Sequence, residues 1–372
     1  MGVVSMSIFE RLALRKKLVK AIKLAVDTAP KIYHVEPTRI IFAIPHGINP
    51  SVLHEKTYVF RQIFGENTEL EGDLKRFILT IPNKPMPTKV PYKLDEWKFA
   101  LDRYQVPIIC GVDSLGNQIV FDMAERPHML ISGETGSGKS SLLRAIITSL
   151  ITTQDSKRIR FILGDLKRSE FGLFRRLPHV ESVSVDITSL EDVLENVETE
   201  MQHRGDLLDR AEVTHINALS EPLPYLIIAI DEVGLLRNEK RIMEIIENIS
   251  SIGRSLGVLL MLSMQRPDAK VLDGRLKNNL TVRISGRQSN KINANVAGLP
   301  GAETIGQTQF GRMLIDLDGI KRVQTPWIDE SQVKKTLEPL KIREVKKSTP
   351  KEEEASTESV VFGLLLGGKY ND

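Results

Sequence analysis

The sequence predicts an α/β fold with a mainly parallel sheet, and two observations support this prediction. Beyond about Pro107, short apolar runs alternate with helical patterns, which is typical of parallel strands joined by crossover helices. Near-continuous apolar runs such as 226–230 fit strands that are covered on both faces. The expected strands are 159–164, 182–185, 225–230, 258–264, 280–285, 312–317 and 322–325.

Composition is that of a globular protein in a reducing compartment. The 372 residues suffice for two domains and tails, and 41% apolar with 27% charged residues is ordinary. The net charge of +3 is the small difference between 51 basic and 48 acidic residues, so it does not by itself predict nucleic-acid binding. The single cysteine, Cys110, excludes an intramolecular disulfide.

Hydropathy predicts a cytoplasmic protein. No apolar run approaches the roughly 18 residues that a membrane span needs. The N-terminus also lacks the uninterrupted apolar core of a signal peptide. We therefore expect a cytoplasmic location, with partners able to hold the protein at the inner face of the membrane.

The first residues predict a basic helix. Residues 7–29 contain no internal Gly or Pro, and Pro30 ends the helical pattern. The expected apolar face comprises Ile8, Leu12, Val19, Ile22 and Val26, and the basic residues are Arg11, Arg15, Lys16, Lys17, Lys20 and Lys23. Such a helix can lie on an anionic membrane or along DNA, and it can equally be a docking helix with a solvated basic face.

A small α/β module follows this helix. Strand-like runs at 39–44 and 75–81 flank a helical pattern at 51–64, and the Pro-rich stretch 82–87 reads as a linker. The module contains no cluster of catalytic residue types, so we interpret it as structural or as a DNA-facing collar. The expected division is a basic helix at 1–34, an accessory module at 35–104, a phosphate-loop domain at 105–345 and a disordered tail at 346–372.

The tail combines two opposite compositions. Residues 346–354 are too polar to bury a core, whereas residues 360–366, VVFGLLL, are almost wholly apolar. An exposed apolar segment on a flexible tether predicts a docking peptide for a partner protein. The alternative is that this segment folds back on the protein itself.

Residues 131–141, ISGETGSGKSS, predict a phosphate-binding loop. The pattern G-x-x-x-x-G-K-[ST] lies here between an apolar run and a helical pattern, the context that this motif requires. Glycines let the backbone wrap around a polyphosphate, and the helix N-terminus favours its negative charge. The expected nucleotide-binding residues are Gly133, Glu134, Thr135, Gly136, Ser137, Gly138, Lys139, Ser140 and Ser141.

Individual residues of the motif have expected roles. Lys139 would reach the β- and γ-phosphates of ATP, and the Ser140 hydroxyl would ligate Mg²⁺. The apolar run 226–230 ends in Asp231 and Glu232. A phosphate-loop enzyme needs such a pair, with Asp231 holding the Mg²⁺ water shell and Glu232 polarising the attacking water. The alternative is that residues 133–140 form only a glycine-rich turn.

Two further polar residues lie near the next expected strand. Gln265 follows the strand 258–264, where a side-chain amide can bridge the γ-phosphate to the rest of the molecule. Arg254 precedes that strand, on a flank that a neighbouring subunit could use, and an arginine supplied in trans stabilises charge on the transferring phosphoryl group. From chemistry alone, each is equally a surface arginine or a strand-end glutamine.

Several segments resemble the FtsK/SpoIIIE family of DNA-translocating ATPases. They are the phosphate loop with 126–133, GDLKR at 164–168, LPY leading into 231–232, MQRP at 264–267, LKNNLTVRI at 276–284 and VQTPWIDE at 323–330. The resemblance covers roughly 107–333 and extends more faintly to the small module, which resembles the family's accessory β-domain. It implies a RecA-like motor fold, a homo-hexameric ring, ATP hydrolysis between subunits, and movement along double-stranded DNA. By position it makes Arg254 the trans finger and Gln265 the γ-phosphate sensor.

The sequence also departs from the family pattern. The membrane-spanning N-terminal region and the C-terminal winged-helix module have no counterpart, and the basic–aromatic run before the second carboxylate strand is QHRG, 202–205, here. A short motor of this kind is typical of members on plasmids and integrative elements. The resemblance therefore favours transfer or maintenance of such DNA over chromosome segregation.

The DNA contacts and the partners are the most open part of the prediction. A ring motor grips phosphates with basic residues that face its channel. The candidates are Lys167, Arg168, Arg175 and Arg176 on one loop, and Arg275 and Lys277 on another, each of which is alternatively a solvated surface charge. Alternative functions are a coupling ATPase that passes relaxase-bound single-stranded DNA to a secretion channel, a protein-export ATPase, and a non-hydrolysing scaffold, which Glu232 disfavours. A relaxase, replication protein or secretion protein could bind through the tail.

Overall fold

The computed structural model describes residues 6–65, 67–72, 74, 76–82 and 85–342. The expected tail at 346–372, with its apolar segment 360–366, lies outside these described residues. The division of the chain at residues 34, 104 and 345 stays a prediction.

The basic helix α1 (Ile8–Val26) begins with a capping box. The Ser7 hydroxyl accepts the Glu10 N–H, and the Glu10 carboxylate accepts the Ser7 N–H. Its buried residues are Leu18, Ala21, Ile22 and Ala25. The expected apolar face was therefore partly wrong, because Ile8, Leu12 and Val19 are exposed to solvent. The burial of two alanines means that close approach of the backbone, rather than large side chains, sets the contact face.

The N-terminal module is an antiparallel sheet with helices. Its strands are β1 (Lys31–Glu36), β2 (Arg39–Ala43), β3 (Glu69–Gly72) and β4 (Phe77–Thr80), in the spatial order β1-β2-β4-β3. The expected helix at 51–64 is two helices, α2 (Ser51–Glu55) and α3 (Thr57–Phe64), which meet at Lys56. Phe42 and Phe77 stack in its core. Strands β1 and β3 were not predicted from the sequence, because they are polar and mostly exposed.

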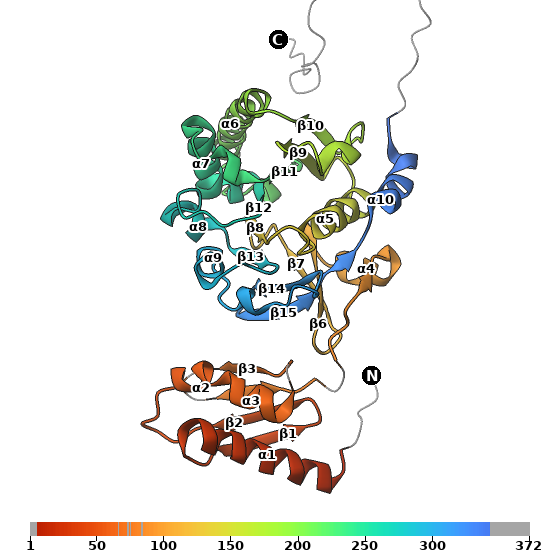
Figure 1. The fold of residues 1–372 in the computed structure, drawn as a ribbon. Helices are drawn as coiled ribbons and strands as arrows, with labels where there is room; N and C mark the ends of the chain where they lie inside the picture. Colours follow the sequence, from red (N-terminus) through yellow and green to blue (C-terminus); the bar gives the residue numbers. More distant parts are fainter. Residues whose placement is uncertain (1–5, 66, 73, 75, 83–84, 343–372) are drawn as a thin grey trace, which may run out of the picture. The chain divides into compact units, whose positions relative to one another are not determined.

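A ten-stranded sheet dominates the rest of the structure (Figure 1). Its spatial order is β10 (Val180–Ser184), β9 (Ile159–Asp165), β11 (Tyr225–Asp231), β12 (Val258–Met264), β8 (Met129–Ser132), β13 (Val282–Ser285), β14 (Arg312–Asp316), β15 (Ile320–Gln324), β6 (Pro107–Asp113) and β7 (Gln118–Asp122). The strands from β10 to β13 pair in parallel, and those from β13 to β7 pair antiparallel. The predicted α/β class with a mainly parallel sheet is confirmed.

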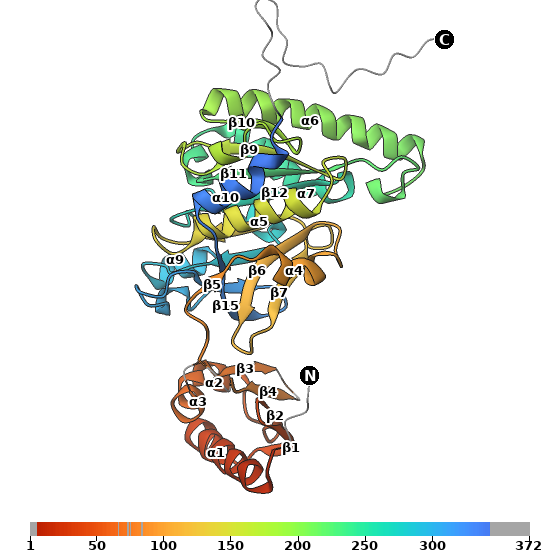
Figure 2. The ribbon, with the colours of Figure 1, turned by 90° about the vertical axis from the view of Figure 1, so that its right-hand side faces the viewer.

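Helices cover both faces of this sheet. Helices α6 (Ile187–Arg210) and α7 (Lys240–Leu256) pack together on one face, and α5 (Lys139–Thr153) and α10 (Glu330–Leu337) cover the other, as Figure 2 shows from that side. Helix α4 (Leu94–Leu101) packs beside α5, and α8 (Gly274–Asn279) beside α7. A short helix, α9 (Lys291–Val296), follows β13. The fully buried strands β11 and β12 carry the near-continuous apolar runs that a two-sided cover requires.

Strand order gathers the expected site residues at one edge. Strand β12 lies between β8, which leads into the phosphate loop, and β11, which ends in Asp231. Because these strands are parallel, their carboxyl ends meet at the same edge, where ligands bind in open α/β sheets. A separate parallel pair, β5 (Val90–Pro91) with β16 (Pro326–Trp327), lies against α5. None of the helices in the described ranges is both long and apolar enough to cross a membrane.

Candidate nucleotide-binding site

The phosphate loop turns tightly between β8 and α5. Gly138 has a φ of 101°, and a Cβ at this position would lie 2.7 Å from the Cα of Gly311. The Gly311 N–H donates to the Ser137 carbonyl at 2.9 Å. Glycine is therefore required at position 138 both by the left-handed backbone and by the close approach of the chain preceding β14.

Lys139 lies in a buried cluster with Asp231 and Ser263. Its Nζ is 2.5 Å from Oδ1 of Asp231 and 3.0 Å from Oγ of Ser263. The Ser263 hydroxyl also donates to Oδ1 of Asp231. The Lys139 and Asp231 side chains are 6% and 3% exposed, so each charge depends on the other for compensation. The structure thus brings together the residue expected on phosphate and the residue expected on Mg²⁺.

The Glu232 carboxylate is held from two sides. Its Oε1 accepts the backbone N–H of Gln265 at 3.0 Å, and its Oε2 lies 2.7 Å from Nζ of Lys167. Glu232 itself has a left-handed backbone, with φ 63° and ψ 56°. Gln265 is therefore at the site as expected. Lys167, which the sequence suggested as a DNA contact, is paired with Glu232.

Asp165 explains how Lys167 reaches Glu232. Its carboxylate accepts backbone N–H groups of Ser169, Glu170 and Phe171 at 2.9 to 3.2 Å, which closes the turn after β9. Asp165 lies directly opposite Asp231 in the β9–β11 ladder. The closed turn therefore starts level with the carboxylate pair at the end of β11.

Arg144, on α5, is paired with the buried carboxylate of Glu170. Oε2 of Glu170 is 3.1 Å from Nη2 of Arg144, which is also 3.3 Å from Oε1 of Glu330. Burial raises the pKa of the Glu170 carboxyl above its usual range, while a hydrogen bond with Ser140 and the charge of Arg144 oppose this rise. Sequence reasoning missed both residues. The available signal was the i,i+4 spacing of Ser140 and Arg144, which puts them on one face of α5.

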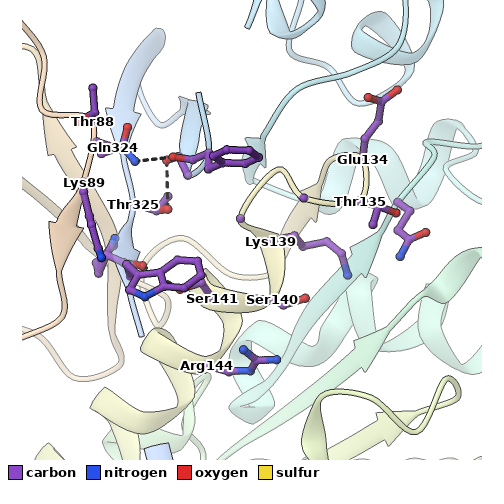
Figure 3. Close-up of a pocket in the computed structure, with 17 residues that line it drawn as sticks. Thr88, Lys89, Glu134, Thr135, Lys139, Ser140, Ser141, Arg144, Gln324 and Thr325 are labelled. Carbon is purple, nitrogen blue, oxygen red and sulfur yellow. Dashed lines mark hydrogen bonds between the residues drawn. The ribbon is translucent and has the colours of Figure 1, made fainter. Parts of the chain in front are cut away.

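The phosphate loop borders a pocket of about 600 Å³, which is large enough for a small-molecule ligand (Figure 3). From the phosphate loop it is lined by Glu134, Thr135, Gly136, Gly138, Lys139, Ser140 and Ser141, with Arg144 and Gln265 beside them. Gly133 and Ser137, also expected to bind nucleotide, stand outside this lining. The Ser141 hydroxyl is turned to β16, where it accepts the Ile328 N–H at 2.9 Å.

The far end of the pocket was not foreseen. Its lining comprises Thr88, Lys89, Phe310, Gly311, Gln324, Thr325, Pro326 and Trp327. These residues come from three segments, at 88–89, 310–311 and 324–327. The last of them lies within the segment 323–330 noted above, but nothing in the sequence indicated that it faces the phosphate loop.

The oxygen donors of the pocket suit Mg²⁺. Mg²⁺ prefers oxygen ligands and is usually held by one or two protein groups together with substrate phosphates. The Ser140 hydroxyl and the Asp231 carboxylate are such donors, one on the first turn of α5 and one at the end of β11. They fit the expected metal role.

Arg254 lies at the opposite edge of the sheet. It is exposed in the last turn of α7 and precedes β12, whose carboxyl end carries Gln265. The length of β12, roughly 20 Å at about 3.3 Å per residue, separates Arg254 from the phosphate loop of its own chain. The structure thus does not bring it together with the other expected catalytic residues.

The basic residues expected to contact DNA lie in two separate parts of the structure. Arg168, Arg175 and Arg176 are exposed on the segment between β9 and β10. Arg275 and Lys277 lie on α8, before β13, and β9 and β13 are separated in the sheet by three strands. Nζ of Lys277 donates to the Asn295 carbonyl at 3.0 Å, and burial lowers its pKa, helped by the charge of Arg283. Lys277 is therefore held within the fold more firmly than the exposed arginines.

The family model and the curated relatives that match this chain agree with one another. Residues 92–270 match the FtsK/SpoIIIE family model. The chain is 29% identical over 260 residues to the DNA translocase FtsK of Tropheryma whipplei, a match that covers 64% of this chain and 35% of that protein. It spans about a third of the length of the curated relatives that it matches.

Two solved structures share the fold. One is the pCW3 conjugation coupling protein TcpA in its monomer form with ATPγS, at a TM-score of 0.61 and 22% identity, covering 87% of this chain and 99% of that one. The other is the cytoplasmic domain of the type VII secretion ATPase EccC of Thermomonospora curvata, at a TM-score of 0.58 and 24% identity, covering 64% and 31%. At these identities the likeness concerns the fold alone.

Proposed function

Because residues 92–270 belong to the FtsK/SpoIIIE family, we propose that this protein hydrolyses ATP and uses the energy to move double-stranded DNA. The observation that carries the proposal is the buried cluster in which Lys139, a lining residue of the phosphate-loop pocket, contacts Asp231 and Ser263, with Glu232 next to Asp231 in the chain. Such a cluster is costly unless a ligand uses it, since buried charges contribute little net stability. Its chemistry is that of phosphoryl transfer.

The proposed chemistry assigns one task to each residue. Lys139 exchanges its contact with Asp231 for the phosphates of ATP, so that both remain compensated. Ser140 and Asp231 would hold Mg²⁺, which would supply positive charge opposite the phosphates. Glu232 accepts a proton from the attacking water as general base. Gln265, whose N–H already binds Glu232, senses the γ-phosphate with its side chain.

Coupling to DNA follows from the loop after β9. Its exposed arginines Arg168, Arg175 and Arg176 can bind phosphates, while Lys167 of the same loop binds the proposed general base. Arg275 and Lys277 form a second proposed contact. Curated relatives of this chain are named DNA translocases, which supports a DNA substrate.

A ring assembly accounts for Arg254. This arginine lies too far from its own pocket to act there, yet it is exposed at the end of α7, where it can meet a neighbour's nucleotide. We propose a homo-hexamer in which Arg254 acts in trans. The proposed domain division at 34, 104 and 345, a cytoplasmic location at or near the inner membrane face, and partner binding by the tail complete this proposal.

The decisive experiment measures ATP hydrolysis by the full chain with linear duplex DNA, with single-stranded DNA and without DNA. Duplex DNA of any sequence should stimulate hydrolysis, and a triplex-forming strand on the duplex should be displaced in an ATP-dependent manner. The matched control is Glu232→Gln, which leaves every basic residue of the proposed DNA-binding loops in place and should not displace the strand. The proposal would be contradicted if the hydrolysis rate were the same with and without DNA and no strand were displaced.

A second candidate function is conjugative coupling, in which single-stranded DNA bound to a relaxase is passed to a secretion channel. The observation in its favour is that the TcpA chain, named a conjugation coupling protein, is matched over 99% of its length. Stronger stimulation by single-stranded than by duplex DNA would favour this function. Stimulation by a secreted protein alone would instead favour export, as for the secretion ATPase EccC.

A further inference from the structure

We infer that Trp327 and its surroundings form a nucleobase subsite, where a purine ring stacks on the indole while its phosphates occupy the loop at 133–140. The inference rests on the proposed nucleotide binding and adds the group that recognises the base. It begins with an unusual exposure. Trp327 is 48% exposed, although its neighbours Pro326 and Ile328 are buried.

Strand alternation explains this exposure. Side chains of a strand point alternately to opposite sides, so burial of Pro326 and Ile328 turns Trp327 away from the core. The face that it turns to is the pocket, because Trp327 is one of its lining residues. A large apolar ring is thus presented to a cavity that otherwise receives phosphates.

The backbone on either side of Trp327 is tied to the first turn of α5. The Ser141 hydroxyl lies 3.2 Å from the carbonyl oxygens of both Pro326 and Ile328, the residues on either side of Trp327. Ser141 follows Lys139 and Ser140 in the first turn of α5. The distance between the phosphate-binding residues and the indole is therefore fixed by short contacts.

The pocket runs continuously between these two ends. Figure 3 shows Thr88 and Lys89 at one side and Lys139 with Glu134 at the other, with Thr325 and Gln324 on the same side as Lys89. An occupant that fills the pocket must therefore have an anionic end and a second end suited to an aromatic wall. A nucleoside triphosphate has this form.

One face of the indole already has a cationic partner. Nζ of Lys89 lies 5.9 Å from the ring centroid of Trp327, within the range of a cation–π contact. Such a contact is weak at an exposed site, so a nucleobase can replace it. Lys89 would then remain close to the bound nucleotide, where its charge favours the phosphates.

The neighbouring polar side chains predict weak selection between purines. Gln324 accepts from Nε of Arg312 at 3.0 Å and donates to the Phe310 carbonyl at 2.8 Å, and Thr325 donates to the Gly311 carbonyl at 3.1 Å. These groups already bond within the protein. Stacking, rather than hydrogen bonding to the base edge, therefore carries the recognition, and ATP and GTP should respond alike to changes at Trp327.

The unaltered chain offers a direct test. It contains two tryptophans, and Trp97 is 1% exposed, so acrylamide quenching of fluorescence reports on Trp327. Mg-ATP should protect this fluorescence, whereas Mg-tripolyphosphate, which has no base, should leave it unprotected. Equal protection by both, or protection by neither when ATP binds, would overturn the inference.

Calorimetric titration of variants gives the second test. Trp327→Ala should weaken Mg-ATP binding by roughly 5- to 150-fold, the effect of removing one base–aromatic stack, and leave tripolyphosphate binding within about twofold. Trp327→Phe should bind ATP nearly as wild type. The matched control is Phe99→Ala on α4, which removes another exposed cation–π pair, with Arg103, and should change neither ligand.

The outcomes separate this inference from the proposed function. If wild-type protein and Trp327→Ala bind ATP equally well, only the nucleobase subsite is refuted. Equal weakening of ATP and tripolyphosphate means that Trp327 merely supports the fold, and again refutes the subsite. A wild-type chain that binds neither ligand refutes nucleotide binding and the inference with it.

Discussion

The Nζ atom of Lys167 lies 2.7 Å from Oε2 of Glu232, so a residue of the basic loop neutralises the proposed general base. The Lys167 side chain is 33% exposed, whereas that of Glu232 is 10% exposed. The lysine can therefore reach solvent, but the carboxylate cannot. One oxygen of the Glu232 carboxylate is thus occupied by an ammonium group and the other by the Gln265 N–H, so neither faces an attacking water in this arrangement. In the proposed function, DNA phosphate would compete with Glu232 for Lys167.

The first prediction concerns this pair. Lys167→Ala should raise ATP hydrolysis without DNA by about fivefold, the rate equivalent of an ion pair of about 1 kcal/mol, and should reduce the stimulation by DNA. Hydrolysis is measured with and without duplex DNA. Arg168→Ala, on the same loop, is the control and should weaken DNA binding without raising the basal rate. A basal rate that falls in Lys167→Ala would mean that Lys167 assists catalysis instead.

The second prediction separates binding from chemistry. Lys139→Ala should abolish measurable nucleotide binding, because it removes the main positive partner of the phosphates and leaves Asp231 buried without its ion pair. Glu232→Gln should bind ATP normally and lower kcat by about 10²- to 10⁴-fold, the usual contribution of a general base. Binding is measured by titration with a fluorescent ATP analogue. Substantial turnover by Glu232→Gln would remove Glu232 from its proposed role.

The third prediction concerns subunit cooperation. Arg254→Ala should bind ATP and assemble, yet hydrolyse about 10³- to 10⁵-fold more slowly, as when an arginine finger is removed. Mixing it with Lys139→Ala should restore part of the activity, since an intact pocket can then face an intact Arg254. The neighbouring Ser255→Ala provides a control for disturbance of the α7 end. Absence of recovery in mixed assemblies would argue against action in trans.

The fourth prediction concerns DNA affinity. Binding should weaken steeply with salt, and removing one phosphate-binding side chain should reduce the slope of log K against log salt by about 0.9. Combined Ala substitutions at Arg168, Arg175 and Arg176 should lower both affinity and slope. Lys334→Ala with Lys335→Ala, exposed on α10, is the control for removal of surface charge and should change neither. An unchanged slope in the triple variant would exclude this loop from the DNA path.

The fifth prediction is a pH dependence of stability from His128. Its Nδ1 accepts the Leu260 N–H at 3.1 Å, and burial lowers its pKa to about 4 from an ordinary 6.5. The unfolded chain therefore takes up a proton before the folded chain does, so stability falls as pH decreases from 6.5 towards 4. A lowering of this size corresponds to about 3 kcal/mol.

The matched variant is His128→Asn. Asparagine retains an acceptor and tolerates the left-handed φ of 59° at this position, but it does not titrate. Chemical denaturation between pH 4 and 7 should show a steeper loss of stability in wild type than in the variant. Parallel curves would mean that His128 is protonated without penalty in the folded protein.

Sequence reasoning predicted what is local in the chain. The loop at 133–140 and the pair Asp231–Glu232 could be read because spacing and flanking apolar runs specify their geometry. Gln265 was expected at a strand end, and strand order places it between them. The sheet class followed from the same apolar runs, which reflect burial on both faces.

Contacts between distant segments could not be read in this way. The pairing of Lys167 with Glu232 depends on Asp165 closing a turn and on β9 lying beside β11. The antiparallel half of the sheet depends on a register that no local pattern reveals. Trp327 reaches the pocket through the separate pair of β5 and β16. Basic residues were judged by composition alone, which cannot distinguish a DNA contact from an internal ion pair.

The contact between Ser141 and Ile328 has a consequence for biosynthesis. The two residues are 187 positions apart, and without β16 the pocket lacks its second wall. At roughly 5–20 residues per second, the ribosome needs about 10–40 s to make the intervening chain. The complete pocket therefore forms only after β16 has been synthesised, and full affinity for nucleotide on nascent chains would mark that moment. A chain released before Trp327 should be recognised by quality control as a species with an exposed, half-built pocket.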